Sequence, residues 1–294
     1  KRISMNSLGV ITVTYNSGAV IDEFLVSLFT QVDVNWHLYV VDSSSQDDTC
    51  NKIIAYSSEK ITLIQQNENV GFAKGNNIGI SRAIFDGCNE LLLINNDTAF
   101  DKGFLTKLLK NRDCNPDLIL TPKIYYPNKT TLWCAGGGFK PNRAYAAYHI
   151  GENETDNGQY DSNYFCSFVP MCCVMIPVST WLKVGQLDEK YFIYSEDADW
   201  FYRAKQLGIK LRYCFEPSLV HKVSSLTGGA KSKTGAWYGS RNRIYFLRKH
   251  FSGWLRYKFL SVYCGGMLIK LILRQYSFKE FGWRVSGAIQ GFKL

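Results

Sequence analysis

The first half of this 294-residue sequence predicts an α/β fold with a mostly parallel sheet flanked by helices. Short β-branched runs alternate there with stretches of helical spacing, an order that implies parallel strands joined by right-handed crossovers. Several of these runs end in polar residues, and such sheets bind ligands at the carboxyl ends of their strands. Hydrophobic residues make up 46% and charged residues 20% of the chain, so a packed core is expected.

The expected elements follow one another with short connections. In the first half, strands are expected at 9–14, 37–42, 61–65 and 90–97, and helices at 20–30, 47–56 and 75–85. The second half is less regular, and its clearest elements are strands at 169–177 and 210–215 and an amphipathic helix at 197–207.

The positive charge of the chain is concentrated in one segment. Residues 237–294 hold eleven Lys or Arg and a single acid, Glu280, within a chain whose net charge is +9. An otherwise neutral body therefore carries a basic, aromatic C-terminal arm. Such an arm favours a polyanionic partner, either a membrane surface or nucleic acid. The arm has no recognisable nucleic-acid motif, so nucleic acid is not expected as a partner.

An apolar stretch at 259–273 lies inside this arm. Gly265, Gly266 and Lys270 interrupt it, and it is shorter than the roughly 20 residues that span a bilayer. Flanking aromatic and basic residues are typical of an amphipathic helix that lies in the interface of an anionic membrane. The alternative is that its apolar face packs on the rest of the chain or on a second subunit, as in a homodimer.

Nine cysteines are spaced irregularly, without a CxxC pair, and only Cys172 and Cys173 are adjacent. Residues 1–7 contain no long apolar run, so a secretory leader is not expected. We expect reduced, mostly buried thiols in a cytosolic protein.

Polar residues end three of the predicted strands, at 14–16, 42–44 and 95–97. Asp97 follows the apolar run 91–94, and a carboxylate there can bind a divalent cation, which takes one or two carboxylates plus phosphate oxygens. The alternative is a simple turn, because Asn and Asp favour turns.

Residues 69–77 (NVGFAKGNN) open a helix after a short strand. Two glycines allow close approach of a ligand, and the N–H groups at a helix start can bind an anion. The segment matches neither GxGxxG nor a P-loop. The alternative is an Asn-rich helix cap.

Three acids, Glu196, Asp197 and Asp199, lie at the start of the helix expected at 197–207. Acids there favour the helix dipole, so a structural role is one interpretation. Their mutual repulsion can also raise one pKa and create a general base. His221 follows a strand and precedes a Gly- and Ser-rich stretch at 224–234, which is expected to be a flexible loop or a lid over a diphosphate.

Together these segments resemble family 2 glycosyltransferases of the GT-A fold, in the rhamnosyltransferase-like branch that builds bacterial surface polysaccharides. The resemblance covers roughly residues 8–250. The matching strings are VTYN (13–16), VDSSSQDDT (41–49), NVGFAKGNN (69–77), LLINNDT (92–98), AGGGF (135–139), YSEDADWFYRAKQLG (194–208), HKVSSLTGG (221–229) and YGSRNRIYFLRKH (238–250). Ser43 departs from the branch, which has Asn at that position.

The resemblance implies a role for each matching residue. Asp197 stands at the position of the catalytic base, Asp97 where a magnesium or manganese ion is held, and His221 at the late His that binds the metal or the diphosphate. Glu196, Gly136 and Gly137 would lie on the acceptor side. The residues implied in binding the nucleotide-diphosphate sugar are Thr14, Tyr15, Asn16, Asp42, Asn69, Gly71, Asn77, Asn95 and Asn96.

The resemblance further implies a catalytic domain at 1–236, with a nucleotide-binding half near 8–98 and an acceptor half near 99–236, before the arm at 237–294. The expected reaction is an inverting, metal-dependent transfer of L-rhamnose from dTDP-β-L-rhamnose to a hydroxyl of a growing, lipid-linked saccharide. UDP-galactofuranose or another UDP-hexose is the alternative donor. The expected location is cytoplasmic, at the inner face of the plasma membrane. A catalytically silent membrane or assembly module is the alternative of another class, and intact Asp97, Asp197 and His221 argue against it.

Overall fold

The computed structural model describes residues 7–56, 58–112, 117–222, 229 and 231–294. The strands are β1 (Leu8–Thr14), β2 (Trp36–Asp42), β3 (Ile61–Gln65), β4 (Glu90–Ile94), β5 (Thr98–Phe100), β6 (Ile119–Tyr125), β7 (Leu132–Cys134), β8 (Gly137–Lys140), β9 (Ala146–His149), β10 (Tyr164–Cys166), β11 (Cys173–Pro177) and β12 (Leu211–His221). The helices are α1 (Ile21–Phe29), α2 (Thr49–Ala55), α3 (Gly71–Phe85), α4 (Phe104–Lys110), α5 (Val178–Val184), α6 (Glu196–Gln206), α7 (Lys233–His250), α8 (Gly253–Ile272) and α9 (Phe278–Gly291), with 3-10 turns η1 (Pro141–Arg143) and η2 (Glu189–Tyr191).

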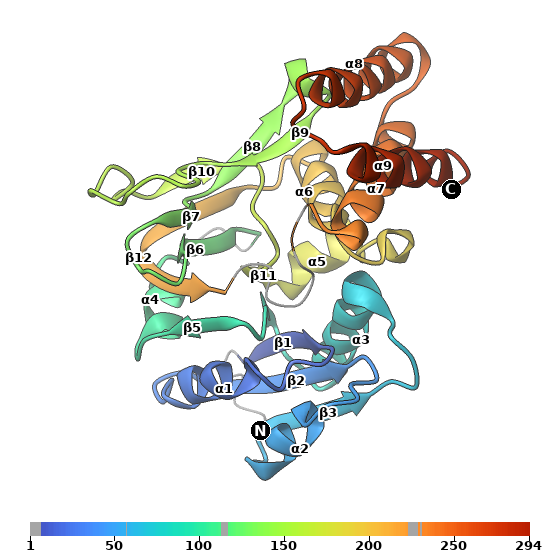
Figure 1. Cartoon of the computed structure of the whole chain (residues 1–294). Helices are drawn as coiled ribbons and strands as arrows, with labels where there is room; N and C mark the ends of the chain where they lie inside the picture. Colours follow the sequence, from blue (N-terminus) through green and yellow to red (C-terminus); the bar gives the residue numbers. More distant parts are fainter. Residues whose placement is uncertain (1–6, 57, 113–116, 223–228, 230) are drawn as a thin grey trace.

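One mixed sheet organises the molecule, in the order β10-β12-β6-β11-β4-β1-β2-β3 (Figure 1). The half formed by β4, β1, β2 and β3 is parallel, as the alternating sequence pattern predicts. In the other half β11 runs antiparallel to both β4 and β6, while β12 runs parallel to β6. β5 and β7 pair with β12 and β6, and β8 and β9 form a separate two-stranded sheet.

Several boundaries differ from the sequence expectations, among them the start of the strand expected at 169–177, which begins at Cys173. The strand expected at 90–97 ends at Ile94, so residues 95–97 form a turn before β5. The helix expected from 75 begins at Gly71. The strand expected at 210–215 extends to His221, because its second part pairs with β5 and β6 across a register shift.

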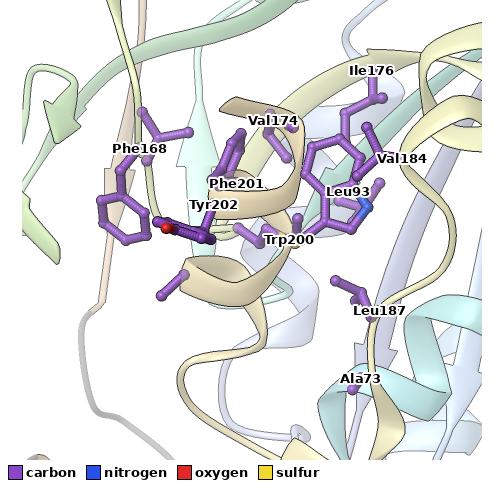
Figure 2. Packing of buried hydrophobic residues seen from close by; sticks show 14 of the residues in the cluster. Ala73, Leu93, Phe168, Val174, Ile176, Val184, Leu187, Trp200, Phe201 and Tyr202 are labelled. Atoms are coloured by element: carbon purple, nitrogen blue, oxygen red, sulfur yellow. The ribbon is translucent and has the colours of Figure 1, made fainter. Parts of the chain in front are cut away.

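α6 carries a run of three buried aromatic residues into the core. Trp200 stacks on Trp181 of α5 with ring centroids 5.6 Å apart. Phe201 meets Phe168 edge to face, and Tyr202 continues the cluster (Figure 2). Because its aromatic side chains are anchored in this core, the first turn of α6 is held firmly beside the sheet.

The C-terminal helices have different degrees of burial. α7 packs into the main core through its buried residues Tyr245, Phe246 and Leu247, so the boundary expected between 236 and 237 falls inside this helix. α9 lies along α7, whereas α8 occupies the edge of the molecule far from β3 (Figure 1). Only Phe259 and Met267 of α8 are buried.

Two glycines let α9 approach α7 at backbone distance. A Cβ at Gly287 would lie 2.1 Å from the carbonyl oxygen of Trp237, and a Cβ at Gly291 would lie 2.3 Å from that of Arg241. Both obstacles are backbone atoms, so any larger residue must push the helices apart. A Cβ added to Gly282 in the same helix would lie in open space.

We expect Gly287→Ala to lower the free energy of unfolding by about 1–3 kcal/mol, the usual cost of overpacking. Gly282→Ala is the matched control, and it should raise this free energy by about 0.5–1 kcal/mol because alanine is the better helix former. Urea unfolding followed by circular dichroism measures both. Equal effects of the two variants would contradict the close helix contact.

Candidate active site

The ends of β1 and β2 form a hydrogen-bonded cluster around Asp42. Thr14 Oγ1 donates to Asp42 Oδ2 at 2.7 Å, and the backbone N–H of Ser45 donates to Asp42 Oδ1 at 2.9 Å. Asn16, at a positive φ of 50°, receives a hydrogen bond from the N–H of Gln46. Tyr15 is 44% exposed beside them. The cluster fixes a buried carboxylate at the carboxyl end of the parallel half.

The turn after β4 faces the end of β12. Asp97 Oδ1 lies 3.1 Å from Nε2 of His221, and both residues are almost fully buried. Asn95 Nδ2 is 3.4 Å from the same imidazole nitrogen, and Asn96 Nδ2 donates to the carbonyl of Val13. Antiparallel pairing of β5 with β12, with His221 opposite Thr98, brings these distant segments together.

This pair suits a divalent cation. Two ligands in neighbouring positions around an ion, each at about 2.1 Å, stand about 3 Å apart, close to the observed separation. Among the described residues no three His, Cys, Asp or Glu side chains are grouped to hold a metal. Asp97 and His221 would therefore supply two ligands, and phosphate oxygens or water the others, as Mg²⁺ and Mn²⁺ sites commonly use.

An aromatic group supports His221 and was not predicted from the sequence. The ring of Trp133 meets His221 edge to face at 4.6 Å and His149 at 4.8 Å. Burial lowers the pKa of His149 below its usual value, so this imidazole is neutral at pH 7. A Trp just before the Gly-rich string 135–139 was the available sequence signal.

The short segment before β11 lies between the two candidate acids. The N–H of Asn95 donates to the carbonyl of Cys172, and the N–H of Met171 lowers the pKa of Asp197. Burial raises the pKa of the Cys172 thiol far above its usual value, and the nearby charges of Asp97 and Asp197 add to this rise. Residues 171–172 thus lie next to the turn that contains Asp97 and to the start of α6.

Asp197 and Glu196 begin α6 with unusual electrostatics. Burial raises the pKa of Asp197 to about 6, although the N–H groups of Ala198 and Met171 oppose the rise. Burial and then the charge of Asp197 raise the pKa of Glu196 well above its usual range. Glu196 Oε2 is buried without a hydrogen bond in the described structure. The arrangement leaves one neutral carboxyl beside one that exchanges protons near neutral pH.

Asp199, the third acid, is fully buried and bound to cations. Arg203 Nε lies 2.9 Å from its Oδ2, and both Lys249 Nζ and His250 Nε2 lie 2.8 Å from its Oδ1. The hydroxyl of Tyr191 also donates to Oδ1. Burial alone would raise the pKa of Asp199, but these partners hold it well below its usual range. Asp199 therefore connects α6 with α7 and stays ionised, whereas Asp197 can exchange a proton.

The start of α3 is already capped by the protein itself. The N–H of Gly71 donates to Asn69 Oδ1, and those of Phe72 and Ala73 donate to the carbonyl of Phe192. The expectation that these three N–H groups are free for an anion is therefore wrong. Gly71 has φ +76° and no room for a Cβ, which would lie 2.7 Å from the oxygen of Phe192.

The segment that caps α3 is strained. Phe192, Tyr194 and Ser195 all have positive φ values, between 62° and 68°. At Phe192 the ψ of −62° and the hydrogen bond from Ile193 N to the carbonyl of Tyr191 define the rare γ-turn of positive φ. Each such residue costs about 1–3 kcal/mol, so the surroundings must hold this segment in place.

The remaining candidate residues have mainly packing roles in the structure. The side-chain amide of Asn77 donates to Leu187 O and Glu189 Oε1 and accepts from Leu187 N, so it connects α3 with the segment before α6. Gly137 allows close approach of β8 and β9, since its Cβ would lie 2.3 Å from the carbonyl oxygen of Tyr148. Gly136 makes the bend before it, with φ +93°.

The lid predicted at 224–234 falls largely outside the described residues. Its end is described and is helical, because α7 begins at Lys233. Ser232 caps this helix by accepting a hydrogen bond from the N–H of Gly235.

Comparison with known proteins gives one family match and several relatives. The model of the family described as "Glycosyl transferase family 2" matches residues 9–169. A low-salt glycan biosynthesis hexosyltransferase, Agl10 of Haloferax volcanii, is 23% identical over 98% of this chain and 92% of its own length. A dTDP-rhamnosyl transferase, RfbF of Shigella flexneri, is 25% identical over 84% of this chain and 82% of its own length.

A solved structure with the same fold is that of GalNAc-T7 with UDP, GalNAc and Mn²⁺, with a TM-score of 0.64. The two sequences are 13% identical, and the match covers 84% of this chain but only 48% of that one. The chain thus spans about half the length of that protein. The likeness shows the GT-A fold, a mixed sheet flanked by helices.

Proposed function

Since this chain belongs to glycosyl transferase family 2, it is a glycosyltransferase, and we propose that it transfers L-rhamnose from dTDP-β-L-rhamnose. The acceptor in this proposal is a hydroxyl of a growing, lipid-linked bacterial polysaccharide. The observation that carries the proposal is the buried pair of Asp97 and His221, whose Oδ1 and Nε2 atoms lie 3.1 Å apart at the turn after β4. The relative named as a dTDP-rhamnosyl transferase favours rhamnose, and UDP-galactofuranose or another UDP-hexose is the alternative donor.

We propose an inverting, single-displacement transfer. Asp197 accepts the proton of the acceptor hydroxyl as that oxygen attacks the anomeric carbon. Asp97 and His221 would hold a Mg²⁺ or Mn²⁺ ion, which would supply positive charge to the departing nucleotide diphosphate. The solved structure of GalNAc-T7, which contains Mn²⁺, supports the choice of Mn²⁺. Base and leaving group then act on opposite faces of the sugar, which gives inversion.

The donor side consists of the cluster at the ends of β1 and β2. Asp42 and Thr14 would hold the base, and Tyr15 and Asn16 the ribose. Asn95 and Asn96 would lie beside the diphosphate, while Asn69, Gly71 and Asn77 support this side from α3. On the acceptor side, Glu196, Gly136 and Gly137 would shape the space near the catalytic base Asp197.

A donor panel tests the substrate. The protein is incubated with dTDP-, UDP- and GDP-sugars and a mixture of saccharide acceptors, and products are identified by mass spectrometry. We expect a mass gain of one deoxyhexose with dTDP-β-L-rhamnose. Transfer of a hexose from a UDP-sugar instead would establish the alternative donor.

We expect Asp197→Asn to lower turnover by about 10²-fold or more, because general-base catalysis contributes about 10²–10⁴-fold. A base must be ionised, and the pKa of Asp197 is raised to about 6. Turnover of the unaltered enzyme should therefore fall as the pH drops below about 6, and stay level above pH 7. Steady-state rates measured from pH 5 to 8 test this pH dependence of turnover.

The free energy of unfolding should respond differently to substitution of Asp197 and of its neighbour Asp199. A carboxyl whose folded pKa is raised costs stability above its unfolded pKa, so Asp197→Asn should not lower the free energy of unfolding at pH 7. Asp199→Asn should lower it by about 3–5 kcal/mol, because buried cations lose their partner. An inactive but stable Asp199→Asn together with an active Asp197→Asn would reverse the assignment of the base.

We expect Asp97→Ala to abolish transfer and weaken Mn²⁺ binding while the protein stays folded. Loss of one of two protein ligands leaves His221 alone to hold the ion. Electron paramagnetic resonance of free Mn²⁺ measures binding, and circular dichroism measures folding. Asp101→Ala, an exposed acid four residues along, is the control and should bind Mn²⁺ normally. Full activity in excess EDTA would contradict the metal site.

We also propose that α8 rests on the cytoplasmic face of an anionic membrane. No helix among the described residues is long and apolar enough to cross a bilayer. Yet α8 and the start of α9 expose large apolar side chains, including Trp254 at 77% and Phe278 at 85%. The exposed bases there are Lys258, Lys270, Arg274 and Lys279, and α8 contains no acid. Each such base contributes about 1 kcal/mol near an anionic leaflet.

Flotation with vesicles tests this surface. The full chain should float with phosphatidylglycerol vesicles at low salt, float less with phosphatidylcholine, and be released by high salt. Phe278→Ser should reduce flotation, whereas Phe85→Ser, an equally exposed phenylalanine at the end of α3, should not. If the chain stays unbound and Phe278→Ser instead dissociates a dimer, the face binds a second copy.

A further inference from the structure

One buried side chain of α7 holds the strained segment before α6. Asn242 is completely buried, and its Nδ2 lies 3.0 Å from the carbonyl oxygen of Tyr191 and 2.7 Å from those of Ile193 and Tyr194. Arg241 Nη1 donates to Asn242 Oδ1 at 2.6 Å, which fixes the orientation of the amide. A single side chain thus binds three carbonyl groups of the tightly bent backbone segment 191–194.

Few other side chains could do this from the same position. Three carbonyl oxygens converge on one nitrogen, so the group there must be a donor and must be small. A carboxylate of the same shape would place negative charge against three acceptors. An apolar side chain would leave buried carbonyls without a hydrogen bond.

The segment that Asn242 holds leads directly to the proposed base. Residues 192–195 contain the γ-turn and the positive-φ positions, and the carbonyl of Ser195 accepts the first helical hydrogen bond of α6, from Asp199 N. Asp197 lies two residues beyond Ser195. The N–H of Met171 also hydrogen-bonds to its carboxylate and lowers its pKa. The position of Asp197 therefore depends on where the backbone of 193–195 is held.

We propose that Asn242 is a positioning residue, which sets the place of the Asp197 carboxylate by holding the strained backbone before it. This inference rests on the proposed role of Asp197 as the base. The same turn contacts the donor side, because Phe192 caps the start of α3 with its carbonyl. The side chain of Asn242 binds the carbonyls of Tyr191, Ile193 and Tyr194 rather than that of Phe192, so we expect donor binding to depend on Asn242 much less than turnover does.

The test uses Asn242→Asp, which keeps the shape but loses the donors, and Asn242→Ser, a milder change in case the first variant does not fold. We expect turnover to fall by about 10²-fold for Asn242→Asp, the effect of misplacing a catalytic group by about 1 Å. The Michaelis constant for the donor should stay within about twofold. The pH below which turnover falls, near 6 in the unaltered enzyme, should also shift, because the surroundings of Asp197 change.

Two comparisons distinguish positioning from general loss of structure. Ser240→Ala alters another fully buried polar residue of α7, one that faces Tyr263 and Met267 of α8, and should leave turnover unchanged. In an Asp197→Asn background, Asn242→Asp should have little further effect on turnover, because both changes act on one group.

The outcomes separate the two claims. An active Asp197→Asn would overturn the base assignment itself. If Asp197→Asn is inactive but folded Asn242→Asp and Asn242→Ser turn over normally, the positioning role is wrong. Independent, multiplying losses in the double variant would also contradict it, since Asn242 would then act through something other than Asp197.

Discussion

The ionised carboxylate of Asp199 is the constraint on which much of the second half depends. A carboxylate with no access to water costs several kcal/mol unless cations and hydrogen bonds replace its hydration. Here α6 supplies Arg203, η2 supplies Tyr191, and α7 supplies Lys249 and His250. No single element could satisfy the charge, so α6 and α7 must lie together. The placement of α7 then decides where α9 can pack.

The candidate active site lies at the junction of two sheet regions with different strand directions. The parallel half contributes Asp42 and the turn that contains Asp97, while the mixed half contributes His221 and the support of α6. Residues 171–172 lie between them, because the carbonyl of Cys172 binds the N–H of Asn95 and the N–H of Met171 binds Asp197. A donor on one side and an acceptor on the other can therefore meet within a site fixed by the sheet.

The sequence predicted the parallel half well, because β1 to β4 are local, β-branched and separated by amphipathic helices. It underestimated β12, whose length depends on pairing with β5 and β6 far away in the chain. The start of α3 was also missed. Its first residue, Gly71, takes a positive φ beneath Phe192, a residue more than a hundred positions later.

Among the site residues, side chains with a chemical signature could be identified from the sequence and backbone partners could not. Asp97, Asp197 and His221 stand out as acids and an imidazole at element ends. The N–H of Met171 carries no signature, since every residue but proline has one. Asp197 and Asp199 look alike in the sequence, and only the burial of Asp197 and the partners around Asp199 give them different proton affinities.

The contact between α7 and the segment before α6 has a consequence during synthesis. Asp197 and Asp199 are translated well before Lys249 and His250, which bind Asp199, and before Asn242, which binds the carbonyls of Tyr191, Ile193 and Tyr194. At about 5–20 residues per second, the ribosome needs several seconds to pass from α6 to the end of α7. A nascent chain in that interval has its strands and its acids but no fixed geometry around them. If α7 positions Asp197 as proposed, newly made protein gains transfer activity only when α7 has docked.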